Sequence, residues 1–593
     1  MSHSVEPHSV EAPVSFTHRQ VLVILSGLML GMFLAALDQT IVATAIRTIA
    51  DDLNGYSLQA WATTAYLITA TLATPLYGKL SDLYGRKPFF MFAISVFVIG
   101  SALCTFSTSM YMLAAFRALQ GLGAGGLFSL ALTIIGDIVS PRERARYQGY
   151  FLAVFGTSSV IGPVLGGVLA GQDTILGIAG WRWVFLVNVP IGLIALTVVF
   201  KVLNLPKRRV DDQRIDWWGA TALAIGVVPL LIVAEQGREW GWGSAGSLVC
   251  YAIGVIGVVA FVLVEVAMKD AALIPMRFFR NGTFTLGVII SFVVGAAMFG
   301  GLTLLPQYLQ VVKGSSPTIA GFQILPMVVA LMLGSVISGQ IISRTGHYRY
   351  FPIAGTALIV VSSLLLHTVA ADTPMPTLMA FMSIVGLGLG FLMQPLTLAI
   401  QNALPSRDMG VSTGAATFFR QIGGTAGVAI FLSVLFSRLT PDIADRVTAA
   451  ADSPEFQQAV VAATQSNDPA VAGLAQGIVS PDHSAMGGVL SDSSVIGRLS
   501  DALALPFKQG FADAIGFVFL VVSILAVVAF LLTLVWKEQP LRTESGIESS
   551  SREQSEREQS EREQPEEDRG ELHTSHKAAS SPRHATSSAR HRA

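Results

Sequence analysis

The feature that most constrains this chain is a series of fourteen long apolar runs, which occupy most of its 593 residues. Each run has about 20 residues or more, enough for a helix to cross a hydrocarbon core of roughly 30 Å. The runs lie near residues 20–44, 57–77, 88–107, 111–136, 147–170, 183–203, 216–235, 246–268, 284–307, 318–342, 350–370, 377–401, 410–437 and 513–536. Only 13% of the residues are charged, whereas about a quarter are charged in soluble domains. We therefore predict an all-α integral membrane protein with 14 transmembrane helices.

The positions of the basic residues predict which loops face the cytoplasm, because loops rich in Lys and Arg stay on that side. With the N-terminus placed inside, the short inner loops hold most of the basic residues. The short outer loops hold only Arg47, Arg182, Arg238 and Lys313. An even number of spans then places both termini in the cytoplasm.

A polar segment that joins two apolar runs occurs twice. Its copies are Gly78 to Pro88 and Gly339 to Arg349, and each keeps two glycines seven residues apart. The copies begin 261 positions apart, an offset that spans eight of the predicted helices. A repeat at this offset indicates two pseudo-symmetric bundles of six helices with an extra pair between them, a 6+2+6 arrangement.

These patterns divide the chain into five parts. They are a cytoplasmic N-terminal segment (1–19), an N-terminal six-helix bundle (20–203), two inserted helices with flanking loops (204–283), a C-terminal six-helix bundle that includes an outer loop at 438–512 (284–536), and a cytoplasmic tail (537–593). The tail contains Ser-Glu-Arg-Glu-Gln repeats and almost no apolar residues, so we expect it to be disordered. Cys104 and Cys250 each lie inside an apolar run, which excludes a disulfide framework.

Several motifs together resemble those of the major facilitator superfamily, and in particular its fourteen-helix drug:proton antiporter family of bacterial multidrug exporters. The segment Gly78 to Pro88 is similar to the superfamily's loop between helices 2 and 3. The other motifs are Leu113, Arg117, Gln120, Gly121 and Gly123 on helix 4; Gly156, Gly162, Pro163, Gly166 and Gly167 on helix 5; Leu37, Asp38, Thr40, Ile41 and Val42 on helix 1; Trp181 to Trp183 with Asn188 and Pro190 on helix 6; and Leu305 to Gln310 on helix 9. The resemblance runs from about Leu22 to Trp536.

Asp38 and Arg117 are the candidates for energy coupling. A carboxylate in the hydrocarbon region costs about 2.5–3.5 kcal/mol on insertion scales, so it usually faces a cavity or a partner. The predicted helix ends place Asp38 and Arg117 at matched depth near the outer side, and the resemblance implies that both handle protons. The alternative is a permanently ionised pair that fixes helix 1 against helix 4.

Helix 5 carries the motif that the resemblance associates with antiporters. Pro163 removes a backbone hydrogen bond, and Gly162 and Gly166 allow a neighbouring helix to approach closely. We expect this helix to form a tight interface between the two bundles; ordinary packing of small residues is the alternative.

The first copy of the repeated segment predicts a conformational latch. Asp82 and Arg86 are four residues apart, which suits an ion pair on one face. The resemblance adds Asp137 at the inner end of helix 4 and assigns the group to holding the outward-facing state. The alternative is that these charges only set topology, although the second copy has Ser343 in place of the acid. The glycines Gly78 and Gly85 belong to the same predicted latch.

The substrate cavity has weaker candidates. We predict that four aromatic residues and one basic residue line it, namely Trp61, Tyr66, Tyr308, Phe418 and Arg420. For Arg420, a satisfied hydrogen bond between helices is the alternative. Glu265, near the inner end of helix 8, we interpret as structural.

The function predicted from these features is proton-coupled export of hydrophobic or cationic drug-like compounds by alternating access. The sequence has no nucleotide-binding Walker A segment, so the expected energy source is a proton gradient. We expect no enzymatic activity, no cofactor, no metal and no nucleic acid; the partners are a small-molecule substrate, protons and the lipid bilayer of the bacterial cytoplasmic (inner) membrane, and the chain acts as a monomer. The alternatives are export of a native lipid, siderophore or metabolite, and a ligand receptor or scaffold that does not transport.

Overall fold

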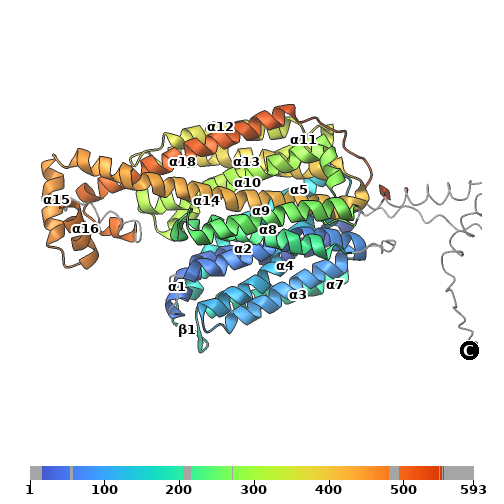
Figure 1. Cartoon of the computed structure of the whole chain (residues 1–593), viewed down its shortest axis with the longest axis horizontal. Coiled ribbons are helices and arrows are strands. Elements are labelled where there is room, and N and C mark those ends of the chain that lie inside the picture. The colour runs from blue at the N-terminus through green and yellow to red at the C-terminus, as the bar shows by residue number, and fades with distance from the viewer. Residues whose placement is uncertain are drawn as a thin grey trace, which may run out of the picture.

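The long helices of the protein run side by side along its long axis (Figure 1). The structure, a computed structural model, describes residues 17–53, 58–204, 215–269, 271–479, 493–545, 548, 549 and 552. The predicted N-terminal segment up to residue 16 and the predicted tail beyond residue 552 lie outside these residues. Thirteen helical segments of the described chain are long and apolar enough to cross a membrane. This finding confirms the all-α class.

The first group of helices comes from the N-terminal third of the chain. It consists of α1 (His18–Asp52), α2 (Gln59–Tyr84), α3 (Arg86–Thr105), α4 (Met110–Ile138), α5 (Pro141–Ala170), a hairpin of β1 (Thr174–Ile175) and β2 (Ile178–Ala179), α6 (Arg182–Leu186) and α7 (Asn188–Val202). Strands β1 and β2 pair antiparallel, with Thr174 opposite Ala179. α2 contains five threonines and is not among the thirteen apolar segments.

The second group repeats the packing of the first. After α8 (Trp217–Trp240) and α9 (Ala245–Met268) come η2 (Met276–Arg280), α10 (Gly282–Gln307), the π-helical turn η3 (Tyr308–Val312), α11 (Pro317–Thr345), α12 (Tyr350–His367), α13 (Met375–Ala403), η4 (Ser406–Asp408), α14 (Met409–Ala450), α15 (Pro454–Thr464), α16 (Pro469–Val479), η5 (Ser493–Arg498) and α18 (Asp501–Val535). The pairs α2 with α4, α1 with α5 and α3 with α7 correspond to α11 with α13, α10 with α14 and α12 with α18. The two groups meet where α5 packs on α11 and α2 on α14, while α8 contacts both α2 and α14.

Glycines at the ends of α2 and α11 explain why both copies of the repeated segment keep them. Gly85 has φ of 96° and Gly346 has φ of 77°, values that a residue with a side chain rarely adopts. Both predicted helix connections therefore depend on glycine at the turn.

Several helices extend further than their apolar runs predict, and the extension is longest in α1, α14 and α18. α1 continues to Asp52 rather than ending near 44, α14 continues to Ala450 rather than 437, and α18 begins at Asp501 rather than 513. An apolar run in the sequence stops at the first charged residues. The helix itself can continue beyond them where other helices still pack against it. α14 keeps such partners, because Ile443 packs so closely on α18 that a methyl group on Gly510 would lie 2.7 Å from its Cα.

Much of the predicted outer loop 438–512 is therefore helical. α15 and α16 project beyond one end of the bundle (Figure 1). Their buried residues Phe456, Val460 and Leu474 join the same apolar core as Leu439 of α14 and Leu503 of α18. The described parts of this segment are therefore a helical continuation of the second helix group.

The predicted tail begins at residue 537, but its first residues are bound to the bundle. The Glu538 carboxylate accepts hydrogen bonds from the backbone N–H groups of Tyr348 (2.6 Å) and Arg349 (3.3 Å), where α12 begins. Arg542 donates to the carbonyl of Leu404 (2.7 Å), and Asn402 donates to the carbonyl of Pro540 (3.0 Å). The acid caps a helix N-terminus and the guanidinium caps a helix C-terminus. Neither contact could be predicted from the distribution of apolar residues along the sequence.

We expect a chain truncated after Trp536 to be less stable than one truncated after Arg552. Only the shorter chain loses Glu538 and Arg542, and a hydrogen bond to a charged group contributes about 1.5–3 kcal/mol. The measurement is the melting temperature of each purified protein in detergent, with a drop of several degrees expected for the shorter chain. Equal melting temperatures would show that residues 537–552 contribute nothing to stability.

Candidate functional site

The Asp38 carboxylate lies fully buried on α1 and accepts hydrogen bonds from three side chains. Arg117 Nη1 on α4 is 2.5 Å from its Oδ2. Gln120 Nε2 and Asn188 Nδ2 donate to Oδ1 at 2.8 and 2.7 Å. An ionised carboxylate survives in such a place only when opposite charge and donors compensate the lost hydration. The structure therefore joins the two residues predicted for energy coupling, and it adds two amide donors.

Arg117 is equally buried and connects three helices. Its Nε donates to the carbonyl of Ala62 on α2 (3.2 Å), and its Nη1 also donates to Gln120 Oε1 (2.7 Å). The guanidinium lies over the ring of Tyr66, with its central carbon 4.1 Å from the ring centroid, a cation–π arrangement. Tyr66, predicted to line the substrate cavity, thus belongs to the Asp38 site.

A break between α6 and α7 brings Asn188 to Asp38. Val187 ends α6, so that Asn188 is the first residue of α7. Its amide also donates to Ser101 Oγ on α3 (3.0 Å), and Ser101 in turn donates to the carbonyl of Phe185 (2.9 Å). Both amides belong to motifs that the sequence shares with the superfamily, but sequence reasoning assigned no role to Asn188 or Gln120.

The predicted pairing of Asp38 with Arg117 is confirmed, whereas α1 extends further past Asp38 than expected. Because α1 continues to Asp52, Asp38 lies fourteen residues from the helix end, which corresponds to about 21 Å along the axis at 1.5 Å per residue. Arg117 lies seven residues from the start of α4, so the two side chains meet although their distances from their own helix ends differ.

Helix α5 packs its glycines against α1, beside Asp38. A methyl group on Gly162 would lie 2.0 Å from Thr40 Oγ1, and one on Gly166 would lie 2.8 Å from the carbonyl oxygen of Ile41. Thr40 Oγ1 donates to the carbonyl of Ser158 (3.0 Å), one turn before Pro163. α5 packs on α11, as predicted for an interface between the two bundles, but the close neighbour of Gly162 and Gly166 is α1 of the same helix group.

Contact with the second helix group comes from an earlier turn of α5. A methyl group on Gly156 would lie 2.8 Å from Val328 Cγ1 of α11. No other atom lies within 4 Å of a methyl group placed on Gly167. The five motif residues thus have different surroundings, and only Gly156 among these glycines faces α11.

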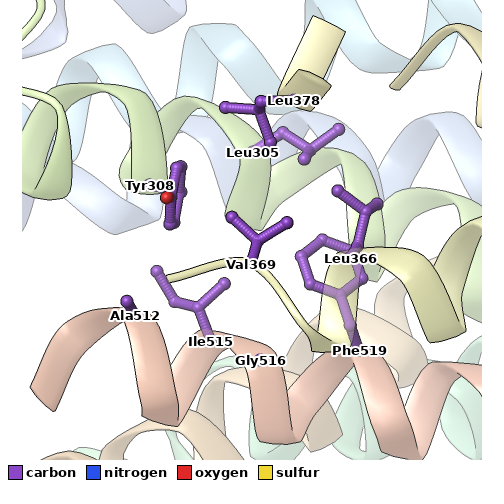
Figure 2. A pocket seen from close by; sticks show the side chains of 9 residues that line it. All are labelled: Leu305, Tyr308, Leu366, Val369, Leu378, Ala512, Ile515, Gly516 and Phe519. Atoms are coloured by element: carbon purple, nitrogen blue, oxygen red, sulfur yellow. The ribbon is translucent and has the colours of Figure 1, made fainter. Parts of the chain in front are cut away.

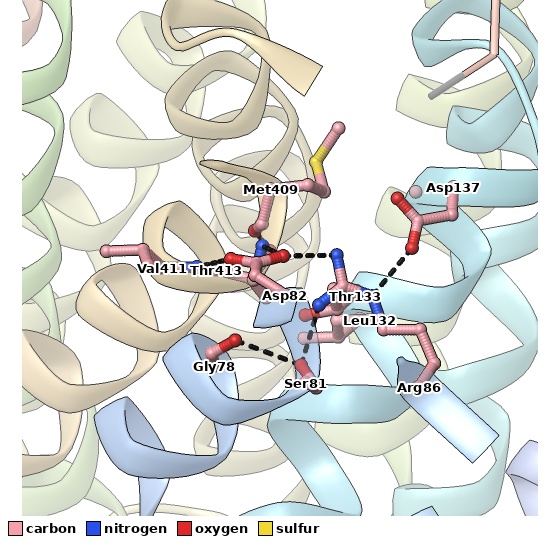
Figure 3. A network of polar contacts seen from close by, with 12 residues as sticks. Gly78, Ser81, Asp82, Arg86, Leu132, Thr133, Asp137, Met409, Val411 and Thr413 are labelled. Carbon is pink, nitrogen blue, oxygen red and sulfur yellow. Dashed lines mark hydrogen bonds and ion pairs between the residues drawn. The ribbon is translucent and has the colours of Figure 1, made fainter. Parts of the chain in front are cut away.

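The predicted latch residues meet at the end of the bundle where α2 joins α3, which we call the latch end (Figure 3). Arg86 pairs with Asp82 (Nη2 to Oδ1, 2.5 Å) and with Asp137 (Nε to Oδ2, 2.7 Å). Its Nη1 donates to Ser81 Oγ (2.6 Å). All three charged side chains are almost fully buried. The structure therefore brings together the three charges that the sequence singled out.

Asp82 also binds the second helix group. Its Oδ1 accepts from the backbone N–H of Gly410 (3.1 Å) and its Oδ2 from that of Val411 (2.9 Å), at the start of α14 (Figure 3). A carboxylate is stabilised at a helix N-terminus by about 0.3–1 kcal/mol, and more when buried. Gly78 allows this approach, because a methyl group there would lie 2.5 Å from the carbonyl oxygen of Gly410.

Two further arginines cross between the helix groups at the latch end. Buried Arg144 donates to Gln401 Oε1 of α13 (2.5 Å), and Gln401 donates to Thr413 Oγ1 of α14 (2.8 Å). Arg142 donates to the carbonyls of Ser343 (2.8 Å) and Arg344 (2.5 Å), where α11 ends. Sequence reasoning used these arginines only to assign topology. Together with Asp82, they join the two helix groups at the latch end.

The other predicted cavity residues do not share one site. Tyr308 donates to the carbonyl of Ala370 (2.7 Å) and lines a small apolar space together with eight residues from α10, α12, α13, α18 and the residues after α12 (Figure 2). Phe418 packs edge-on against Phe419, in another apolar core. Trp61 lies half-buried on α2, and Arg420 lies half-buried on α14. In the described part of the chain, these residues outline no common cavity.

The described residues include no cluster of three or more His, Cys, Asp or Glu side chains that is placed to hold a metal ion. The polar chemistry of the site consists instead of buried carboxylates, guanidinium groups and amides. Such a site can bind and release protons and can change its hydrogen bonds.

Comparison with known proteins shows which family this chain matches. Residues 28–428 match the family described as the Major Facilitator Superfamily. The chain is 36% identical over 462 residues to the multidrug transporter protein MdtP of Bacillus subtilis (strain 168), covering 77% of this chain and 84% of that protein. It is 35% identical over 483 residues to multidrug resistance protein 3 of the same organism, covering 81% of this chain and 89% of that protein.

Solved structures agree at the level of the fold. The chain superimposes on the proton:xylose symporter XylE with a TM-score of 0.55 at 13% identity, over 90% of this chain and 99% of that one. It also superimposes on the human organic anion transporter MFSD10 with a TM-score of 0.52 at 14% identity, over 85% of this chain and 99% of that one.

We expect Gly162→Ala to destabilise the protein and Gly167→Ala to leave it as stable or slightly more stable. The first change forces a methyl group into Thr40, and overpacking typically costs about 1–3 kcal/mol. The second meets open space and gains up to about 1 kcal/mol of helix propensity. The readout is the melting temperature of the two variants; if both melt together, the close packing of α5 on α1 is not a constraint.

Proposed function

Because the chain belongs to the Major Facilitator Superfamily, we propose that it exports hydrophobic or cationic drug-like compounds in exchange for protons. Family membership makes it a transporter in a membrane and not an enzyme. The multidrug names of MdtP and multidrug resistance protein 3 support this substrate class. The observation that carries the proposal is the buried Asp38 carboxylate paired with Arg117.

The surroundings of Asp38 suit a carboxyl group that alternates between binding a proton and pairing with Arg117. When Asp38 is ionised, it compensates Arg117, and the hydrogen bonds from Gln120 and Asn188 favour this form. When Asp38 takes up a proton, Arg117 remains as an uncompensated buried cation, which is costly. Protonation therefore favours a rearrangement of α1 against α4, and Asp38 takes its proton from outside as substrate leaves.

We propose that the latch end faces the cytoplasm. The basic residues Arg86, Arg142, Arg144 and Arg344 gather there, as the rule for cytoplasmic loops requires. In this orientation both termini are cytoplasmic, and the closed latch end corresponds to an outward-facing arrangement.

The proposed topology counts α2 as a fourteenth span in addition to the thirteen apolar segments. α2 packs against α4 within the first group, as α11 packs against α13 within the second. With α8 and α9 as the inserted pair, the arrangement is 6+2+6. The protein then works as a proton-driven exporter in the cytoplasmic membrane, without a cofactor.

We expect Asp38→Asn to abolish uphill export while leaving downhill movement of the compound possible. The amide keeps the size of the side chain but cannot exchange a proton. The measurement is ethidium transport by vesicles that contain the purified protein, driven by an imposed proton gradient. Asp513→Asn is a matched control, because Asp513 is 39% exposed and distant in sequence from the site.

Uphill ethidium export by the Asp38→Asn protein would contradict the assignment of Asp38. If the wild type moves no proton with ethidium but does so with a lipid or another metabolite, the protein is an exporter of a native compound.

A further inference from the structure

The inserted helix pair carries two buried acids at the latch end, outside the Asp38 site and the latch. Asp216 caps α8, and its Oδ1 accepts from the backbone N–H of Gly219 (2.7 Å). Glu265 lies one turn before the end of α9, and its Oε2 accepts from the backbone N–H of Ile274 (2.9 Å). Asp216 is 2% exposed and Glu265 is 0% exposed.

The second oxygen of each carboxyl group lacks a hydrogen-bond partner within the described chain. These atoms are Asp216 Oδ2 and Glu265 Oε1. Both face the same small space beside Gly219, because a methyl group on Gly219 would lie 2.4 Å from Asp216 Oδ2 and 2.9 Å from Glu265 Oε1. Two acids on different helices therefore place their unsatisfied oxygens beside the same small space.

Two ionised carboxylates would repel each other in this arrangement. Like charges at short range disfavour ionisation, and a buried polar atom without a partner costs free energy. A single proton removes both costs, since it halves the charge and turns one acceptor into a donor for the other oxygen. Paired carboxyl groups that share one proton are a known consequence of this geometry.

The surrounding charges connect the pair to the latch. Lys79 on α2 is the cation that acts on Glu265, and it also interacts with Asp82 and Asp408. Arg277 on η2 is a further cation near Lys79, and it pairs with Asp408 at 3.4 Å. The charge of Glu265 therefore acts on the same lysine that interacts with Asp82.

We propose that Asp216 and Glu265 form a second proton-binding site, a buried carboxyl dyad that holds one proton while the latch end is closed. It goes beyond the proposed export function and does not depend on it. Because Lys79 interacts with Glu265 and with Asp82, loss of this proton changes the electrostatic balance beside the latch. From the sequence we interpreted Glu265 as a structural residue, and we predicted no proton-binding role for it.

The test is infrared spectroscopy of the purified full-length protein without substrate, near neutral pH. All proteins carry Asp38→Asn, so that Asp38 contributes no protonated carboxyl signal. In this background we compare the parent with Glu265→Gln and Asp216→Asn. Gln keeps the acceptor for Ile274, and Asn is a good helix cap, so both variants are expected to fold.

We expect the parent to show the C=O band of one protonated carboxyl group, shifted in heavy water, and each variant to lose it. Persistence of the band in both variants would overturn the proposal, and so would its absence from the parent. A carboxylate band that changes on adding NaCl or KCl in the parent, with no protonated band, would identify a cation site instead. Because no transport is measured, failure here is distinct from failure of the export proposal.

Discussion

The buried charge of Asp38 is the constraint on which the first helix group depends. An acid at this depth must be matched by donors, and they come from α4 and α7, with Arg117 in turn anchored to α2. Removing one partner of a buried ion pair typically costs about 3–5 kcal/mol, because the other charge is left behind. Four helices are thereby fixed around one carboxylate, and a change in its protonation acts on all of them.

The helices that hold Asp38 also hold the latch. α4 carries Arg117 near one end and Asp137 near the other, while α2 carries Ala62 and Asp82 in the same way. These two helices pack closely: a methyl group on Gly125 of α4 would lie 2.2 Å from the carbonyl oxygen of Ala70. In the proposed mechanism, a shift of α4 against α1 is transmitted to Arg86 and to the cap that Asp82 places on α14. Packed helices of this kind move as units rather than deform.

The sequence predicted the charged pairs but not their neutral partners. Asp38, Arg117, Asp82 and Arg86 could be found because a charge within or beside an apolar run requires a partner, whereas Asp137 was added by the resemblance to the superfamily. Gln120 and Asn188 gave a weaker signal, and the N–H groups of Gly410 and Val411 gave none, since backbone donors leave no mark in the residue types. Helix ends were misplaced because packing, not hydropathy, ends α1 and α14, and the glycines of α5 could not reveal which helix they face.

The most direct test of the account is whether binding of a cationic compound displaces the proton of Asp38. The measurement is proton release by purified protein in weakly buffered detergent on adding tetraphenylphosphonium, at a pH where part of the protein is protonated. The account predicts proton release from the wild type and a loss of that release in Asp38→Asn, although the variant remains folded. Binding to the wild type without proton release, or equal release by the variant, would contradict it.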